Sequence, residues 1–438
     1  MKVERSCINK MSETVLVQSQ AKPKRGIRAL SAHRSYFVML AAKIISVFGD
    51  SVDSIAYSWM VYMLTGSKVL MGTLFAASFI PGIAFSPFTG VLVDRWSKKK
   101  VIVIAGIGRG ITVSLTAFLY FMGSLEPWHL FVFTMLNSSF QCFSRPAEAA
   151  IVPRLLPKEL LLTGNSITAS VSRTAEIGGL AAAGGLIALA GISGTMIINA
   201  SSFFLEALLY FFIRLNREEE PPVEPHGDSG AKAKSSYWKE FRIGLQFVIK
   251  NRLILLTMMA GAFVNLCLCP WNVLQPVYVK EILHSGPFGL SLLGITLMIG
   301  MILGGLFISQ RGDRYKKSTL IVFGILLLGV TYSMLYLPAL FTYYPLYAAT
   351  LFSFGMGFAI SFVNTPIATY SMEVTPKNML GRISALSNMI VTCTIPLGGV
   401  IAGFAGTWLS ANVVFLVFGL LMIIPGRLLL THKSFMSI

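Results

Sequence analysis

Two aspartates, Asp50 and Asp53, stand three positions apart within the long apolar stretch that begins after residue 35. At helical spacing they share one face, a single turn apart. Two carboxylates at that distance repel each other when both are ionised, and binding one proton removes the repulsion. This pair is therefore our first prediction for a proton-coupling site. Lys43, two turns earlier, is placed to neutralise one carboxylate, and a hydrogen-bonded structural role for either aspartate is the alternative.

Two further pairs of charged residues have the same spacing in later apolar stretches. Arg145 precedes Glu148, and Arg173 precedes Glu176. A charge at mid-membrane costs about 2.5–3.5 kcal/mol on insertion scales, so such residues usually face a cavity or a partner. Glu148 and Glu176 are further proton-coupling candidates, with internal salt bridges as the alternative. The polar network predicted around them comprises Lys43, Arg109, Arg145 and Arg173.

Charges of this kind occur only in the first half of the chain, so any coupling to protons should reside there. The apolar stretches of the second half offer aromatic and amide side chains instead. A cavity with one acidic wall and one apolar wall suits an amphipathic organic molecule better than a small sugar or anion. The alternative is that these aromatic side chains face lipid or pack in a core. The candidates for the substrate cavity are Asn265, Trp271, Phe358 and Asn364.

The composition indicates the elements that must position these residues. Of the 438 residues, 54% are hydrophobic and only 13% are charged, and the mean hydropathy is +0.70. This leaves too little polar surface to cover a soluble globule of that size. The sequence therefore predicts an all-α integral membrane protein.

A membrane-spanning helix needs about 20 apolar residues, and the sequence contains about twelve such runs. In the first half they cover residues 36–64, 70–93, 100–122, 128–152, 160–190 and 194–214. In the second half they cover residues 253–280, 288–310, 318–338, 343–372, 382–405 and 408–431.

Lysine and arginine collect in alternate connections, which predicts the orientation in the membrane. If the N-terminus is cytoplasmic, the outer loops keep only Lys68 and Lys280. Both termini are therefore expected inside, in a multi-pass protein of the cell (plasma or inner) membrane. The net charge of +17 is then a topology signal, and we expect no nucleic-acid partner.

Four regions are expected along the chain. Residues 1–35 form a basic cytoplasmic tail, and residues 36–215 and 253–438 form two six-helix bundles. Residues 216–252 form a cytoplasmic linker, polar and proline-bearing at first. Its last part, residues 237–252, has the apolar spacing of an amphipathic helix lying at the membrane surface.

The two bundles share an internal repeat. An Asp-Arg-aromatic sequence at residues 94–96 recurs at residues 313–315, an offset of 219. Two more matches keep this offset within one residue and pair residues 156–161 with 375–380 and residues 177–183 with 397–403. Three matches in one register predict a duplicated six-helix unit.

The sequence "GVLVDRWSKKK" at residues 90–100 resembles the loop motif of the major facilitator superfamily. Residues 48–72 and 145–166 resemble its branch of macrolide-efflux and enterobactin-exporter permeases, as does Arg109. The resemblance covers essentially the whole chain and implies two pseudo-symmetric bundles and secondary transport. Ser97 replaces a glycine usual in the motif, and no proline interrupts residues 160–190, which weakens an inference of antiport from that segment.

The resemblance also implies a conformational switch. In the family the motif aspartate docks the two bundles together in the outward-open state, and free N–H groups at a helix start can accept such a carboxylate. Asp94 is assigned to the helix start near residues 381–382, and Asp313 to the start of residues 160–190. The alternative is that the basic residues only set orientation. The predicted switch comprises Gly90, Asp94, Arg95, Lys98, Lys99, Asp313 and Arg314.

Enzyme motifs are absent from the sequence: it has no Walker A, H-E-x-x-H or G-x-S-x-G pattern. Its five cysteines are scattered, so we expect no metal site and no cofactor. The sequence predicts a proton-coupled exporter of amphipathic, drug- or siderophore-like small molecules that works by alternating access. The alternatives are an uptake permease, a lysolipid transporter, or a transporter-like sensor or scaffold.

Overall fold

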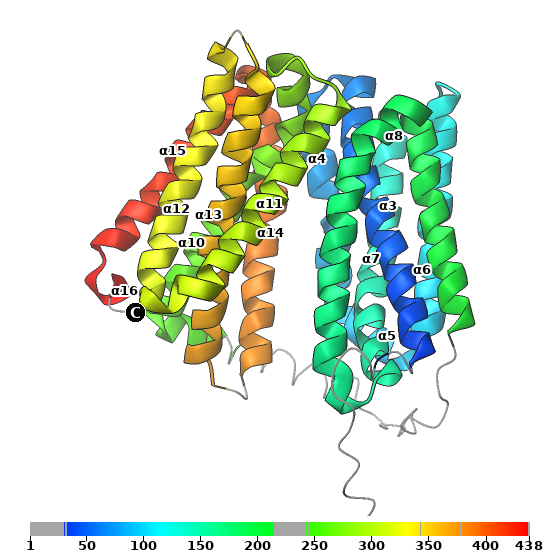
Figure 1. Ribbon diagram of the computed structural model, residues 1–438, viewed down its shortest axis with the longest axis horizontal. Helices are drawn as coiled ribbons and strands as arrows, with labels where there is room; N and C mark the ends of the chain where they lie inside the picture. Colours follow the sequence, from blue (N-terminus) through cyan, green and yellow to red (C-terminus); the bar gives the residue numbers. More distant parts are fainter. Residues whose placement is uncertain are drawn as a thin grey trace, which may run out of the picture.

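The computed structural model describes residues 33–213, 245–341, 343–376 and 379–436, together with Leu30 and Arg242. These residues are nearly all helical and contain no strand. Two groups of helices stand side by side (Figure 1). The first, called here the N bundle, comprises α3 (Arg34–Thr65), α4 (Lys68–Ala77), α5 (Ile80–Arg95), α6 (Lys98–Phe121), α7 (Pro127–Leu155), the turn η1 (Lys158–Leu160) and α8 (Leu161–Phe212).

The second group is called here the C bundle. Its first part comprises α10 (Arg252–Val277), η3 (Tyr278–Ile282), α11 (Pro287–Arg311), η4 (Gly312–Arg314) and α12 (Lys317–Ser333). Its second part comprises η5 (Met334–Leu340), α13 (Pro345–Val374), α14 (Leu380–Trp408), α15 (Ala411–Thr431) and α16 (Lys433–Met436). Residues 216–241, 243 and 244 of the expected linker lie outside the described residues, and residues 245–250 are helical.

Ten segments of the described chain are long and apolar enough to cross a membrane. α8 runs along the bundle, breaks at Gly191 and returns, so it supplies two of the expected spans. Gly191 has φ of 70°, which glycine adopts without a side-chain clash. α4 and α5 share one expected span, and α7, more polar, supplies another. The described helices therefore account for the all-α membrane fold.

Local signals in the sequence set where several helices begin and end. α3 ends at Gly66, which has φ of 60°. The Ser67 hydroxyl accepts a 3.2 Å hydrogen bond from the Leu70 N–H and caps α4. Glu126 and His129 form a capping box at the start of α7. Proline in the first turn of α7, α11 and α13 fits the missing N–H of that position.

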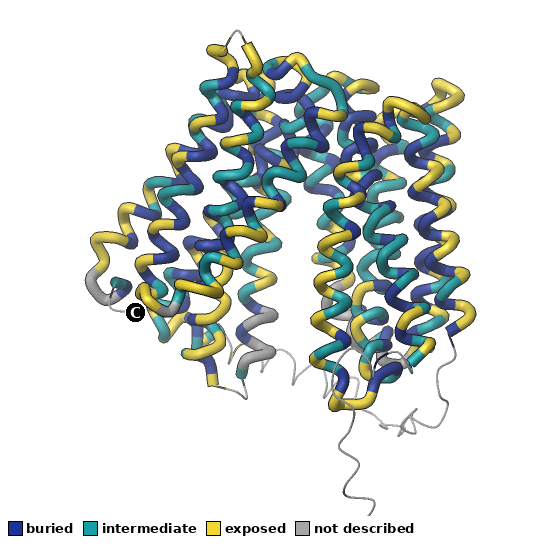
Figure 2. Tube along the Cα trace, viewed as in Figure 1, coloured by how far each residue is buried: buried dark blue, intermediate teal, exposed yellow. Residues whose placement is uncertain are grey.

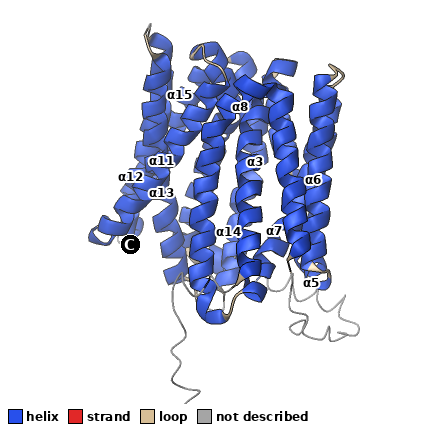
Figure 3. Ribbon diagram, turned by 45° about the vertical axis from the view of Figure 1, so that its right-hand side comes forward, coloured by secondary structure: helices blue, strands red, loops and turns tan. Residues whose placement is uncertain are grey.

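The bundles meet at one end of the molecule and diverge toward the other (Figures 1 and 2). We call the end where α3 begins and α15 ends the terminal end, and the opposite end the distal end. Contacts between bundles join α4 to α14 and α8 to α11. Figure 3, turned by 45°, shows that the described residues are nearly all helical and contain no strand.

Small residues allow this close approach at the distal end. A Cβ on Gly72 would collide with the backbone of Gly399 and Gly403, and one on Gly184 would lie 2.7 Å from Phe288 Cα. The Gly184 N–H also donates a 2.9 Å hydrogen bond to the Ser291 hydroxyl. Such packing of backbone on backbone needs glycine, as at other helix interfaces within membranes.

Candidate functional site

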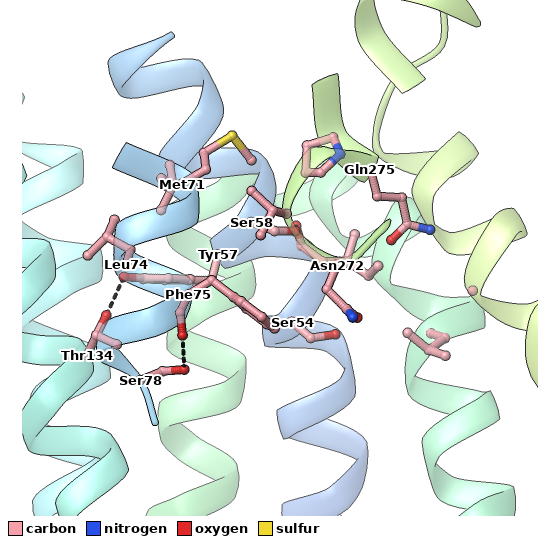
Figure 4. Close-up of a pocket in the computed structure, with 16 residues that line it drawn as sticks. Ser54, Tyr57, Ser58, Met71, Leu74, Phe75, Ser78, Thr134, Asn272 and Gln275 are labelled. Atoms are coloured by element: carbon pink, nitrogen blue, oxygen red, sulfur yellow. Dashed lines mark hydrogen bonds between the residues drawn. The ribbon is translucent and has the colours of Figure 1, made fainter. Parts of the chain in front are cut away.

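A pocket of about 390 Å³ lies between the two bundles, below their distal contact. Figure 4 shows that it is lined by Ser54, Tyr57 and Ser58 of α3 and, across from them, by Asn272 and Gln275 of α10. α4 contributes apolar side chains, Met71, Leu74 and Phe75. The lining therefore combines uncharged hydrogen-bonding groups with apolar surface, and both bundles contribute to it.

Carboxylates lie beside this pocket on the N-bundle side. Asp50 and Asp53 line a neighbouring hollow of about 200 Å³, which shares Ser54 and Tyr57 with the central pocket. Asp50 also lines a third hollow, together with Glu176 of α8. The structure thus brings together three of the four carboxylates that the sequence singled out.

Asp50 is paired with a buried arginine. Arg109 of α6, only 5% exposed, donates from Nη2 to Asp50 Oδ1 at 2.6 Å and from Nε to Asn137 Oδ1 at 2.9 Å. The guanidinium lies over the Phe203 ring, with Cζ 3.9 Å from the ring centroid. Asp50 is therefore the counter-ion of Arg109.

Glu148 is paired with Lys43. The Lys43 ammonium lies 2.5 Å from Glu148 Oε2, and the Ser144 hydroxyl donates to Oε1 at 2.9 Å. Lys43 therefore pairs with Glu148 of α7 and with neither of the two aspartates. Arg145, three positions before Glu148, is exposed, so the local pair suggested by spacing is replaced by one between α3 and α7.

The second pair suggested by spacing is present: Arg173 Nη1 donates to Glu176 Oε2 at 2.8 Å. Both side chains are substantially exposed, at 65% and 35%. An exposed pair of this kind stabilises a protein by only about 0–1 kcal/mol. Glu176 also lines the hollow that it shares with Asp50.

Two carboxyl groups of the N bundle each keep one oxygen without a hydrogen-bond partner. They are Asp53, through Oδ1, and Glu206 of α8, through Oε1. Glu206 is 3% exposed and lies beside Ser46 of α3. The sequence left Glu206 out of the candidate site, because no charged residue lies three or four positions from it on α8.

At the distal end a second polar cluster joins the bundles. The Tyr62 hydroxyl of α3 donates to Glu281 Oε1 at 2.6 Å, and Lys68 Nζ lies 3.2 Å from Glu281 Oε2. Lys280 Nζ lies 5.4 Å from the centre of the Tyr62 ring. Glu281 lies near the end of its span, so sequence position alone gave it no role.

The predicted switch motif lies at the terminal end. The surroundings of Gly90 and the side chains of Asp94, Arg95 and Asp313 lie outside those described, so the docking assignments of Asp94 and Asp313 stay predictions. Lys99 donates to the Ile213 carbonyl at 2.9 Å. Ser97 has φ of −64°, a conformation that does not require glycine. Lys98 is buried and Arg314 is exposed.

The four cavity candidates of the C bundle do not line the central pocket. Trp271 is 7% exposed and packs against Phe415, with ring centroids 5.7 Å apart. Phe358 packs with the phenylalanines at 307 and 362, and the Asn265 amide donates to its own helix. Asn364 is exposed on α13. Asn272 and Gln275 of α10 do line the pocket.

The family model and the related proteins found by comparison agree on one family. The family model "Major Facilitator Superfamily" matches residues 39–394. Macrolide efflux protein A of Streptococcus pyogenes is 21% identical over 388 residues, covering 89% of this chain and 93% of that protein. Multidrug efflux pump Tap of Mycolicibacterium fortuitum is 22% identical over 405 residues, covering 89% and 93%.

Solved structures show the same fold. A bacterial homologue of the iron transporter ferroportin, in an inward-facing state, superposes with a TM-score of 0.69 and 16% sequence identity. The superposition covers 91% of this chain and 99% of that one.

Proposed function

The chain belongs to the major facilitator superfamily of membrane transporters, and from that premise we propose that it is a proton-driven exporter of amphipathic small molecules. Transport proceeds by alternating access, in which the N and C bundles rock about the central pocket. The observation that carries the proposal is the pocket between the bundles, with Asp50 and Asp53 lining the adjoining hollow on its N-bundle side.

The chemistry of the pocket supports this class of substrate. Hydroxyl and amide groups such as Tyr57, Asn272 and Gln275 can orient a polar group. The apolar side chains Leu74 and Phe75 cover the rest of a molecule. A small sugar or inorganic anion would gain little from that apolar wall. The relatives named for macrolide efflux and multidrug efflux support the same class.

The proton is assigned to Asp53. Arg109 and Lys43 are the counter-ions of Asp50 and Glu148, whereas one Asp53 oxygen is buried without a partner. A carboxylate in that position is costly to keep ionised, and a bound proton removes the cost. Asp53 also lines a hollow that adjoins the central pocket, so binding a proton there can influence binding of the substrate.

The orientation follows from the basic residues. Those at helix ends of the terminal end include Lys100, Arg154, Lys158, Arg311 and Lys316, while Lys68 and Lys280 lie at the distal end. By the positive-inside rule the terminal end and both termini face the cytoplasm of a cell membrane. The conformation described here is then open toward the cytoplasm, ready to load a substrate for export.

The test uses purified protein in liposomes with an imposed proton gradient. Efflux of macrolides, cationic dyes and siderophores is followed for the wild type, for Asp53→Asn and for Glu159→Gln. Glu159, exposed in η1, provides a control carboxylate away from the pocket. We expect gradient-driven efflux in the wild type and the control, and its loss in Asp53→Asn while binding of the compound persists.

Four outcomes would contradict the proposal. Efflux that ignores the proton gradient would exclude proton coupling, and undiminished efflux in Asp53→Asn would remove Asp53 from it. Movement of substrates only in the opposite direction, or movement of lysolipids alone, would favour the uptake or lysolipid alternative.

A further inference from the structure

Around Arg109, the described part of the N bundle holds more acidic than basic side chains. Asp50, Asp53, Glu148 and Glu206 lie around two cations, Arg109 and Lys43. Arg109 is paired with Asp50, and Lys43 is paired with Glu148. Two acids are left over, and a membrane interior does not support unpaired charge. Asp53 has been discussed above, so Glu206 is the acid whose role is open.

Glu206 lies next to Arg109 as well as to Asp50. The Arg109 guanidinium covers the ring of Phe203, which is three positions before Glu206 on α8. α6 and α8 are tightly packed at this level, because a Cβ on Gly106 would lie 3.1 Å from Ala207 Cβ. Arg109 uses Nε and Nη2 for Asn137 and Asp50. A guanidinium has five N–H donors, so it keeps donors for a further carboxylate.

The charged and titratable groups that face Glu206 come from every neighbouring helix. α3 contributes Asp50, α6 contributes Arg109 and α7 contributes Glu148, while Tyr210 lies one turn further on α8. The Ser46 hydroxyl of α3 lies against the Glu206 carboxyl. Arg109 is the cation in this group, and Asp50 is its carboxylate partner.

We propose that Arg109 alternates between two carboxylates, Asp50 and Glu206, and that Glu206 carries a proton while Arg109 is held by Asp50. The proposal deepens the proposed function and rests on it. Asp50 is the solvent-facing partner, with 39% of its side chain exposed, and it lines two hollows. Glu206 is the buried partner, so the pair of carboxylates links the hollows to the interior of the bundle.

The exchange balances in protons and charge. When a proton or the cationic group of a substrate binds to Asp50, Arg109 is released from Asp50 and pairs with Glu206. The O–H bond of Glu206 then breaks, its proton passes to water in the hollow at Asp50, and the carboxylate keeps the electron pair. The buried cluster therefore gains no net charge, which is the condition for such a step within a membrane.

The experiment detects the proton on Glu206 directly. Infrared spectra of the protein in liposomes contain the carbonyl-stretch band of each protonated carboxylic acid. The wild-type spectrum minus that of Glu206→Gln isolates the band of Glu206. The same difference is then taken in an Asp50→Asn background, where Arg109 has lost its first partner, and in an Asp53→Asn background as the matched control.

We expect the Glu206 band in the wild type and in Asp53→Asn, and its loss in Asp50→Asn. Absence of the band in the wild type, or a band of equal size in Asp50→Asn, would overturn the proposal. Size-exclusion chromatography checks that each variant is folded, and Asp50→Ser replaces Asp50→Asn if the latter elutes as aggregate. The result is independent of the transport assay, because Asp53→Asn can abolish efflux and still retain the Glu206 band.

Discussion

The Tyr62 hydroxyl donates a 2.6 Å hydrogen bond to Glu281, and the two residues are 219 positions apart, which is the offset of the internal repeat. Each is therefore the counterpart of the other in the duplicated halves. A shift of 219 positions also takes Gly184 to Gly403 and Gly72 to Ser291, so the contact of Gly184 with Ser291 is the repeat counterpart of the contact of Gly403 with Gly72. The distal interface is thus self-complementary about a pseudo-two-fold axis, as in an isologous dimer.

Removing the Tyr62 hydroxyl should weaken the contact between the two bundles at the distal end. A hydrogen bond to a charged group contributes about 1.5–3 kcal/mol, so Tyr62→Phe and Glu281→Gln should each shift the ratio of closed to open conformations by about ten- to a hundredfold toward the open one. Hydrogen–deuterium exchange of α4 and α14 measures the change. Tyr343→Phe, at an exposed tyrosine, is the control, and unchanged exchange in all three variants would show that the bridge does not hold the bundles.

A methyl group on Gly184 should disfavour the conformation described here. The new Cβ would lie 2.7 Å from Phe288 Cα, where backbone cannot give way. Gly185→Ala is the matched control, because a Cβ there meets nothing within 4 Å. The control replaces a glycine within a helix by alanine, and this replacement alone stabilises the helix by up to about 1 kcal/mol. Cross-linking between α8 and α11 should fall in Gly184→Ala only, and equal yields would place the close contact elsewhere.

Glu148→Gln should destabilise the N bundle because it leaves the Lys43 ammonium without its counter-ion. The pair is only partly exposed, at 30% and 16% of the side chains. We expect a loss of about 1–3 kcal/mol, below the 3–5 kcal/mol of a fully buried pair. Glu176→Gln, at an exposed pair, should change the melting temperature little. The double variant with Lys43→Gln should regain much of the loss, and failure to do so would argue against direct pairing.

Asn272→Ala should weaken substrate binding, since the Asn272 amide lines the central pocket. Loss of one hydrogen bond of about 0.5–1.5 kcal/mol corresponds to roughly a two- to tenfold rise in Kd. Asn364→Ala, an exposed asparagine outside this pocket, is the control. Affinity for a compound found in the efflux panel is measured by fluorescence titration. A larger effect from Asn364→Ala would move the substrate site toward α13.

The sequence predicted the helices well because their signals are local. Apolar runs, glycine and proline breaks and capping residues are all read within a few positions. The all-α membrane fold was therefore available before the structure, and so was the family. Boundaries moved where a tight turn joined two spans, as at Gly191, because two apolar helices meeting at one glycine leave no polar loop in the sequence.

The candidate site was predicted less completely, because helical spacing finds neighbours on one helix only. The Arg173–Glu176 pair was visible in this way. Lys43 with Glu148, Arg109 with Asp50 and Tyr62 with Glu281 were not, since they join residues far apart in the chain. Glu206 and Asn272 acquire their surroundings from other helices for the same reason.

The sequence by itself therefore determined that this chain is a membrane transporter of twelve predicted spans in two related halves. It also determined that the charged residues within the spans belong to the first half. Apolar periodicity and charge suffice for that, because each helix must satisfy the membrane individually. The tertiary structure alone decided which charge neutralises which, which acids are left without a counter-ion, and which face of α10 lines the pocket. Those outcomes depend on how the helices rotate and pack against one another, and no local pattern records that rotation.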